Sequence, residues 1–359
     1  MTNPYQNLAD YQFWRRAISA VELHAVDPVV TPKFCINQSE RVATAGSCFA
    51  QHISHRLSTI GFNYYVPESG DDFIETDRTK LGYGIFSARY GNIYTVRQLL
   101  QLFEETFGIR SKSESVWLRD DGRYVDPFRP NIESLGYDNP TAVIAERKQH
   151  IEYVKQVFLN SDIFVFTLGL TESWFNRSSG DVFPLAPGVS GGSYDPDTYG
   201  FVNFTVNDVI ADLRSFLSQF KKINPSVRVL LTVSPVPLIA TFENRHVLVS
   251  TTYSKSVLRV VAETAMNDYD WVDYFPSYEI ITGNFNAGRY YELDLREISS
   301  IGVSHAMRCF LKNYIADSDT VESSQFSKKT TQNEITYNES FSRMENVICD
   351  EELIDKVSF

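Results

Sequence analysis

The residues most able to do chemistry lie in the hexapeptide Ala45-Gly46-Ser47-Cys48-Phe49-Ala50. It follows the apolar run 42–45 and leads into a helical pattern of apolar residues that reaches Leu57. A glycine permits a tight turn from strand to helix, and a hydroxyl at the start of a helix faces free backbone N–H groups and the positive end of the helix dipole. The pattern therefore predicts that Ser47 is a nucleophile. Cys48 is the weaker candidate for that role, and a helix N-cap is the alternative role of Ser47.

Further polar residues follow the other predicted strands. Ligands of open α/β sheets bind outside the carboxyl ends of the strands, so these residues are expected to lie near Ser47. They occupy segments 167–172 and 234–237 and the segment around Asp294, and Gly91-Asn92 ends a loop rich in glycine and tyrosine. Two nearby residues suit a saccharide: the Glu172 carboxylate can accept from sugar hydroxyls, and the Trp174 ring can stack on a sugar. A helix-turn carboxylate and a core aromatic are the alternative roles of these two.

Alternating apolar runs and helical patterns indicate the elements that position these residues. Buried strands are expected at 42–45, 162–168, 227–233 and 271–275, and a short strand at 61–65. Helical spacing follows the first strand and recurs at 141–160, 206–220, 254–267 and 299–315. Since parallel strands need crossover helices, this alternation predicts an α/β fold, a three-layer α/β/α sandwich with a mainly parallel central sheet.

Three regions are expected along the chain. Residues 1–40 form an N-terminal lead-in packed on the body, and 41–315 form the α/β domain, with 176–203 as a long surface excursion. Residues 316–359 carry half of the formal net charge of −12 and few apolar side chains. Such a composition buries too little surface to offset the entropy of ordering, so an acidic, disordered tail is expected, with a weak helix near 344–355.

Composition excludes several classes of protein. No stretch approaches the roughly 20 apolar residues that span a bilayer, so a cytoplasmic protein without membrane insertion is expected. The negative charge argues against nucleic-acid binding, because phosphate contacts need clustered Lys and Arg. The four cysteines show no C-x-x-C spacing, and no cluster has metal-ligand spacing, so neither a metal nor another cofactor is expected.

The pentapeptide Gly46-Ser47-Cys48-Phe49-Ala50 resembles the motif that names the GSCFA family. Four further stretches resemble blocks of that family, namely 90–95, 166–174, 234–237 and 253–259, so the resemblance covers roughly residues 10 to 315. The family is placed with the SGNH or GDSL-like hydrolases, and its bacterial members are linked to surface-polysaccharide biosynthesis. The resemblance implies ester chemistry on an acylated substrate.

Roles for individual residues follow from this resemblance. Ser47 matches the nucleophile, and its backbone N–H matches one oxyanion donor. Gly91 matches a second donor, while Thr171 stands where the family of hydrolases carries asparagine, so that Asn92 is an alternative third donor. Removing one oxyanion donor costs on the order of 3 kcal/mol in the transition state, so the identity of these donors matters.

The last block departs from the hydrolase pattern. Asp-x-x-His is expected there, and this chain reads Asp294-Leu295-Arg296-Glu297. A serine at neutral pH needs a general base, and a carboxylate of ordinary pKa is a poor one. Three residues are candidates for the base: His246, favoured because it lies in a loop after a strand end, then His305, then Glu297. Asp294 would orient the base or cap the last helix.

The function expected from the resemblance is that of a serine ester hydrolase or O-acyltransferase. It would transfer an acyl group, acetyl foremost, through an acyl-Ser47 intermediate. The expected partners are an acylated saccharide or a small ester, with an acyl donor in the transferase case. The alternative is an inactive module of the same fold that binds a glycan or a protein, and a weaker alternative is a scaffold that acts through the acidic tail.

Overall fold

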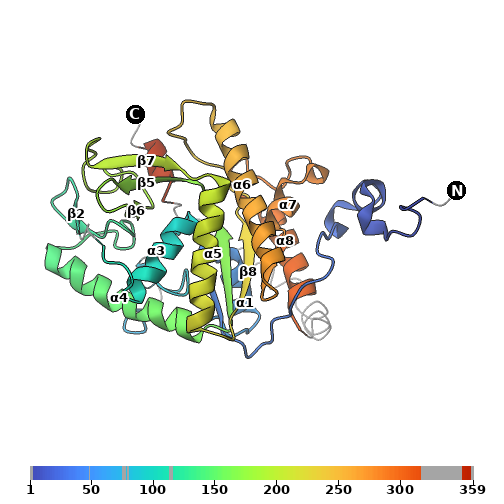
Figure 1. Cartoon of the computed structure of the whole chain (residues 1–359), viewed down its shortest axis with the longest axis horizontal. Helices are drawn as coiled ribbons and strands as arrows, with labels where there is room; N and C mark the ends of the chain where they lie inside the picture. The colour runs from blue at the N-terminus through green and yellow to red at the C-terminus, as the bar shows by residue number, and fades with distance from the viewer. Residues whose placement is uncertain are drawn as a thin grey trace.

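Four apolar runs form the parallel sheet at the centre of the computed structural model, which describes residues 3–47, 49–74, 78, 81–112, 116–316 and 350–356. The strands are β1 (Val42–Gly46), β4 (Ile163–Leu168), β8 (Arg228–Val233) and β9 (Val272–Tyr274), hydrogen-bonded in that order (Figure 1). Gly46 pairs with Thr167, and Thr167 pairs with Thr232. The carboxyl ends of the first three strands are therefore level, which brings the residues after them to one edge.

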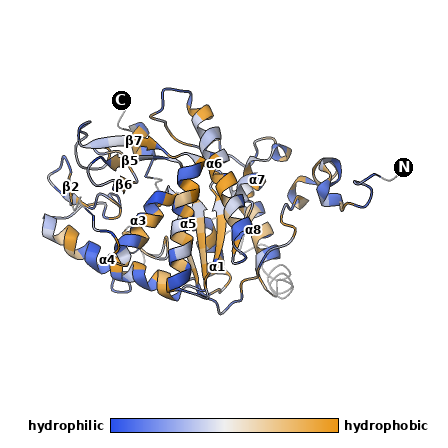
Figure 2. Cartoon of the chain, in the orientation of Figure 1, coloured by the Kyte–Doolittle hydropathy of each residue, from blue (hydrophilic) through white to orange (hydrophobic). Residues whose placement is uncertain are grey.

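Helices cover both faces of this sheet. Phe164 and Phe166 point into one core, whereas Ile163 and Val165 point into the other. The first core is covered by α3 (Val96–Thr106), α4 (Pro140–Asn160), α5 (Val206–Ile223) and α6 (Val247–Asp268), and the second by α1 (Ala50–Thr59), α7 (Ser277–Thr282) and α8 (Ser300–Tyr314). Figure 2 shows the apolar strands between these helices. The predicted three-layer α/β/α sandwich is confirmed. No helix among the described residues is long and apolar enough to cross a membrane.

The N-terminal segment contacts the body only in its second half. Its helical turns η1 (Asp10–Gln12) and η2 (Arg15–Ser19) bury no residue and project away from the body (Figure 1). After η3 (Leu23–Ala25), Val26 and Ile36 are buried, and the Ile36 N–H donates to the Tyr314 carbonyl at 2.7 Å. The later part of residues 1–40 thus packs along α8. The sequence analysis expected the same of the entire segment.

Part of the predicted surface excursion is a small second sheet. Strand β5 (Glu172–Asn176) pairs in antiparallel fashion with β6 (Val182–Phe183) and β7 (Tyr199–Asn203). A hairpin of β2 (Trp117–Leu118) and β3 (Tyr124–Val125) packs on it through buried aromatic side chains. Strands β2, β3 and β6 have two residues each, too few for a sequence pattern to reveal. Conversely, the predicted strand at 61–65 is only an isolated bridge between Val42 and Tyr64.

The end of the chain returns to the body, which corrects the prediction of a disordered tail for residues 350–356. Glu351 is buried there, at 7% exposed, and α11 (Glu352–Lys356) follows it. Part of the predicted weak helix at 344–355 therefore exists. Residues 317–349 and 357–359 lie outside the described residues.

Candidate active site

The turn at Ser47 is built around Gly46. Gly46 has φ +127°, and a Cβ on it would lie 2.3 Å from the Thr167 carbonyl oxygen, so a side chain there would collide with the neighbouring strand. Helix α1 begins only at Ala50, and its N-cap, Phe49, makes no side-chain capping bond. The Ser47 hydroxyl is buried and has no hydrogen-bond partner among the described residues. The N-cap role is thus not the role of Ser47; Cys48 lies outside the described residues.

A small pocket opens beside the Ser47 hydroxyl, with a volume of about 10 Å³. A Cβ on Gly169 would lie 2.9 Å from the Tyr94 carbonyl and 3.4 Å from the Ser47 Cβ, so the absence of a side chain there leaves the space open. The pocket is lined by Ser47, Tyr94, Gly169, Leu170, Ser234, Val236, Lys255, Arg296 and Glu351. Most of these residues follow strands of the central sheet, as the sequence predicted for the site.

Lys255 is a pocket residue that the sequence analysis missed. It lies on α6, is 1% exposed, and its Nζ donates to the Gly169 carbonyl at 2.7 Å. A signal was present, since Lys255 shares a helical face with the buried residues Leu258 and Ala262. A lysine on an apolar helix face is rare unless it is paired or functional.

Arg296 is the member of the last block that reaches the pocket. Its Nη2 donates to the Glu351 Oε2 at 2.9 Å, and both side chains are buried. Asp294 and Glu297 are exposed, and Asp294 accepts from the backbone N–H groups of Arg296 and Glu297 at 3.0 Å. Burial and the negative charge of Asp294 raise the pKa of Glu297. The block therefore places a cation at the pocket, while its two carboxylates lie outside.

The structure does not bring His246 or His305 to Ser47. His246 is exposed and caps α6, where its Nδ1 accepts from the Leu248 N–H at 3.1 Å. His305 is buried in the second core, with Nδ1 2.6 Å from the Tyr290 hydroxyl and Nε2 2.7 Å from the Val26 carbonyl. Since that carbonyl can only accept, Nε2 carries a proton, and burial lowers the pKa of this ring. In the described ranges, no group of three His, Cys, Asp or Glu side chains could hold a metal ion.

Of the predicted oxyanion donors, Asn92 lies beside the Gly46 turn but does not line the Ser47 pocket. The Ile93 N–H donates to the Gly46 carbonyl at 3.0 Å, which places the adjacent Asn92 beside the turn after Gly91, whose φ is +66°. The Asn92 Nδ2 and backbone N–H both donate to Asp350, the former at 3.0 Å.

Two other predicted donors are already engaged. The Ser47 N–H donates to the Thr167 carbonyl at 3.2 Å, which extends the pairing of β1 with β4. The Thr171 hydroxyl donates to the Asn203 Oδ1 at 2.7 Å. Neither proton is therefore directed at the space beside the Ser47 hydroxyl.

The predicted sugar-binding residues form a separate surface. Glu172 accepts from the Thr241 hydroxyl at 2.6 Å and from the Phe242 N–H at 3.3 Å, and burial raises its pKa. The Trp174 ring packs against Phe242, with centroids 4.7 Å apart, and against Tyr194, at 5.3 Å. Neither residue lines the Ser47 pocket, although both follow β4 in sequence.

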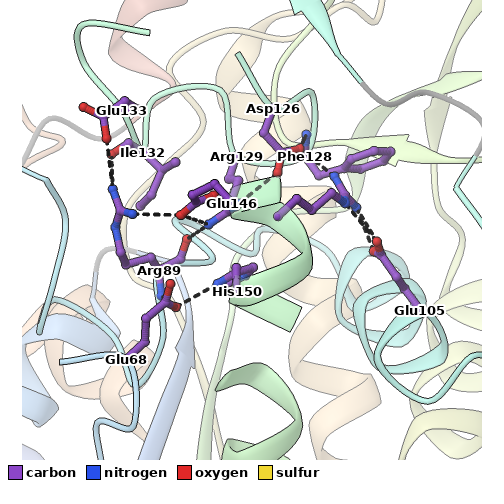
Figure 3. A network of polar contacts seen from close by, with 11 residues as sticks. Glu68, Arg89, Glu105, Asp126, Phe128, Arg129, Ile132, Glu133, Glu146 and His150 are labelled. Carbon is purple, nitrogen blue, oxygen red and sulfur yellow. Dashed lines mark hydrogen bonds and ion pairs between the residues drawn. The ribbon is translucent and has the colours of Figure 1, made fainter. Parts of the chain in front are cut away.

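A buried network of charges fixes the loops that carry Asn92 and Asn131 (Figure 3). Arg89 and Arg129 both reach Glu146 on α4, and Arg129 also donates to Asp126 at 2.9 Å. Burial alone would raise the pKa of Asp126, but Arg147 and Arg129 hold it below its usual value. Burial and Arg129 lower the pKa of His150, whose Nδ1 lies 2.8 Å from the Glu68 Oε2. Every charge in this network has a partner, so its role is to hold these loops in place.

Together, these features define an α/β protein with a buried serine at the carboxyl edge of a parallel sheet, whose hydroxyl has no partner in the described part of the chain. The GSCFA family model matches residues 41–310, and the chain belongs to the GSCFA family. No curated protein matches the sequence. A Clostridium thermocellum family 3 carbohydrate esterase is similar in structure, with 12% identity and a TM-score of 0.26, over 62% of this chain and 88% of that chain. A likeness of that TM-score supports no conclusion.

Proposed function

We propose that this protein is a serine-dependent ester hydrolase or O-acyltransferase that acts on an acylated saccharide. The observation that carries the proposal is the Ser47 hydroxyl, buried without a partner among the described residues at a strand-to-helix turn. A buried hydroxyl usually forms a hydrogen bond, and leaving one unmade costs about 1–3 kcal/mol. A hydroxyl kept free at such a turn is suited to attack an ester carbonyl.

Lys255 is the general base of the proposed mechanism. Of the described pocket residues, only Lys255, Arg296, Glu351 and Tyr94 can titrate, and arginine keeps its proton. A lysine base acts as the neutral amine, a form that burial favours, and the Lys255 side chain is 1% exposed in this pocket. The Lys255 amine takes the proton as the Ser47 oxygen attacks, and a tetrahedral oxyanion forms.

The remaining steps use the same groups. Once Asp350 moves away, the Asn92 N–H and Nδ2 stabilise the oxyanion, which collapses with transfer of the Lys255 proton to the leaving alcohol. An acyl-Ser47 ester remains. Water, in a hydrolase, or a sugar hydroxyl, in a transferase, then attacks the acyl carbonyl as it gives its proton to Lys255. Lys255 returns that proton to the Ser47 oxygen as the bond between Ser47 and the acyl group breaks.

Labelling by a fluorophosphonate probe tests this proposal, because such a probe reacts with activated serines. We expect the wild-type chain to be labelled and to release p-nitrophenol from p-nitrophenyl acetate, and Ser47→Ala to do neither. Ser234→Ala is the matched control, since Ser234 lines the same pocket and its side chain already accepts from the Val236 N–H at 3.3 Å. Equal labelling of wild type and Ser47→Ala would contradict the proposal.

A binding module without turnover is the second candidate function. Two observations favour it: no histidine lines the pocket in the described part of the chain, and Glu351 already occupies the pocket. This candidate predicts glycan binding, measured by calorimetry, that is the same in wild type and Ser47→Ala, together with no ester cleavage by either. Loss of ester cleavage in a folded Lys255→Met variant would exclude it.

A further inference from the structure

The described C-terminal residues place two consecutive carboxylates at the candidate site. Asp350 accepts from the Asn92 Nδ2 at 3.0 Å and from the Asn131 Nδ2 at 2.7 Å. Glu351, the next residue, accepts from Arg296 at 2.9 Å and lines the pocket with Ser47. The segment therefore occupies both the proposed oxyanion donors and the cationic side of the pocket.

The body of the protein supplies that cationic side. Lys255 from α6 and Arg296 from the segment before α8 are 1% and 8% exposed, and both line the pocket. A buried cation such as the Arg296 guanidinium is costly unless an anion lies beside it, because it loses its hydration. Burial raises the pKa of Glu351, although Arg296 and Lys255 act to lower it. Glu351 and Glu352 are the carboxylates that face Arg296, at 2.9 and 3.8 Å.

The space left beside Glu351 is too small for a substrate. A volume of about 10 Å³ holds about one water molecule, whereas small-ligand pockets measure roughly 300–1,000 Å³. Any saccharide ester that reaches Ser47 must therefore displace Glu351. A neutral sugar that displaced this segment would remove the two carboxylates next to Arg296, Glu351 at 2.9 Å and Glu352 at 3.8 Å, whereas a sugar with a carboxylate would replace that charge.

We infer that the pocket beside Ser47 is a carboxylate-binding site, and that its ligand is an acidic, uronic-type saccharide whose carboxylate takes the place of Glu351 against Arg296. The inference deepens the proposed function and relies on it only for the ester at Ser47. The chain's own residues 350–356 then compete with the ligand, so that occupancy of the pocket depends on the ligand's concentration.

Calorimetric titration of the full chain with methyl glucuronide and methyl glucoside tests this inference, because the two sugars differ only in the carboxylate. We expect an Asp350→Ala/Glu351→Ala variant to bind the glucuronide at least about tenfold more tightly than wild type, because the competing carboxylates are removed. The same variant should bind the glucuronide about tenfold more tightly than the glucoside, since only the glucuronide gains a charge-assisted hydrogen bond. Adding Arg296→Gln should remove the preference. Asp355→Ala is the matched control, an exposed carboxylate of the same segment, and should bind as wild type does.

Hydrogen exchange of the wild-type chain gives an independent test that needs no folded variant. Glucuronide at saturating concentration should speed exchange of the amides of 350–356, and glucoside should not. Equal affinity for the two sugars, or unchanged exchange in 350–356, would overturn the inference. Neither readout uses ester cleavage, so an inactive chain that prefers the glucuronide would refute the esterase and keep the anion site, and an active chain without preference would do the reverse.

Discussion

At the scale of single residues, the site depends on a few side chains that are costly to bury. Arg296 brings positive charge and Lys255 an amine to the space beside Ser47, and the hydroxyl of Ser47 lies there without a partner among the described residues. None of these features improves packing. Buried polar groups of this kind are kept where chemistry or binding requires them.

Lys255→Met should reduce ester cleavage by about 100-fold or more while the fold is kept, because general-base catalysis contributes roughly 10²–10⁴ in rate. Lys221→Met is the matched control, since the Lys221 Nζ also donates to a backbone carbonyl, that of Val227, at 2.8 Å. The rate of p-nitrophenyl acetate cleavage and the circular dichroism spectrum provide the measurements. Full activity in Lys255→Met would show that another group is the base.

Gly46→Ala should destabilise the fold by at least about 3 kcal/mol, since its Cβ would overlap the Thr167 carbonyl and the backbone of β4 cannot move aside. Gly84→Ala separates the two causes, because Gly84 also has a positive φ, +76°, but nothing lies within 4 Å of its Cβ position. About 1 kcal/mol is expected for that control. Denaturant unfolding measures both, and equal losses would show that the collision with Thr167 is unimportant.

At the scale of elements, the central sheet could be predicted from the sequence, whereas the candidate site could be predicted only in part. Strands β4 and β8 read as continuous apolar runs because both of their faces are buried, and this signal is local. The position of Ser47 followed from the same local pattern. Arg296 could not be placed, because only tertiary contacts turn it inward while Glu297 beside it stays exposed.

The network around α4 gives a prediction for its loops. Arg129→Met should cost about 3–5 kcal/mol of stability, because buried Asp126 and half-buried Glu146 lose this partner and keep only Arg147 and Arg89, respectively. Arg123→Met removes an exposed ion pair with Asp138 and should cost about 0–1 kcal/mol. Thermal or denaturant unfolding distinguishes the two. Similar losses would mean that the network does not anchor the loops more firmly than a surface ion pair.

The free energy of unfolding should depend on pH because of His52, which lies on α1. Burial, and then His55, lowers the pKa of His52 from 6.5 to about 4. Below pH 6.5 the unfolded chain binds a proton that the folded chain refuses, so stability falls as the pH drops towards 4, by up to about 3 kcal/mol. His52→Gln should flatten this part of the curve of urea midpoint against pH, and exposed His24→Gln should not. An unchanged slope in His52→Gln would contradict the burial of a neutral imidazole.

At the scale of the whole molecule, the site joins segments from both ends of the chain. Asn92, Lys255 and Arg296 come from separate elements, and residues 350–356 return to them from the far end of the sequence. Composition predicted disorder for this tail because its apolar content is low. What holds residues 350–356 is ion pairing and hydrogen bonding to the site, which composition does not report.

The central claim is that Ser47 forms an acyl intermediate, and mass spectrometry of the intact chain tests it most directly. After brief incubation with p-nitrophenyl acetate and acid quenching, we expect a mass increase of one acetyl group, mapped by proteolysis to the peptide that contains Ser47. Ser47→Ala should show no such increase. An acetyl group found on Lys255, on Cys48 or equally on both variants would contradict the account.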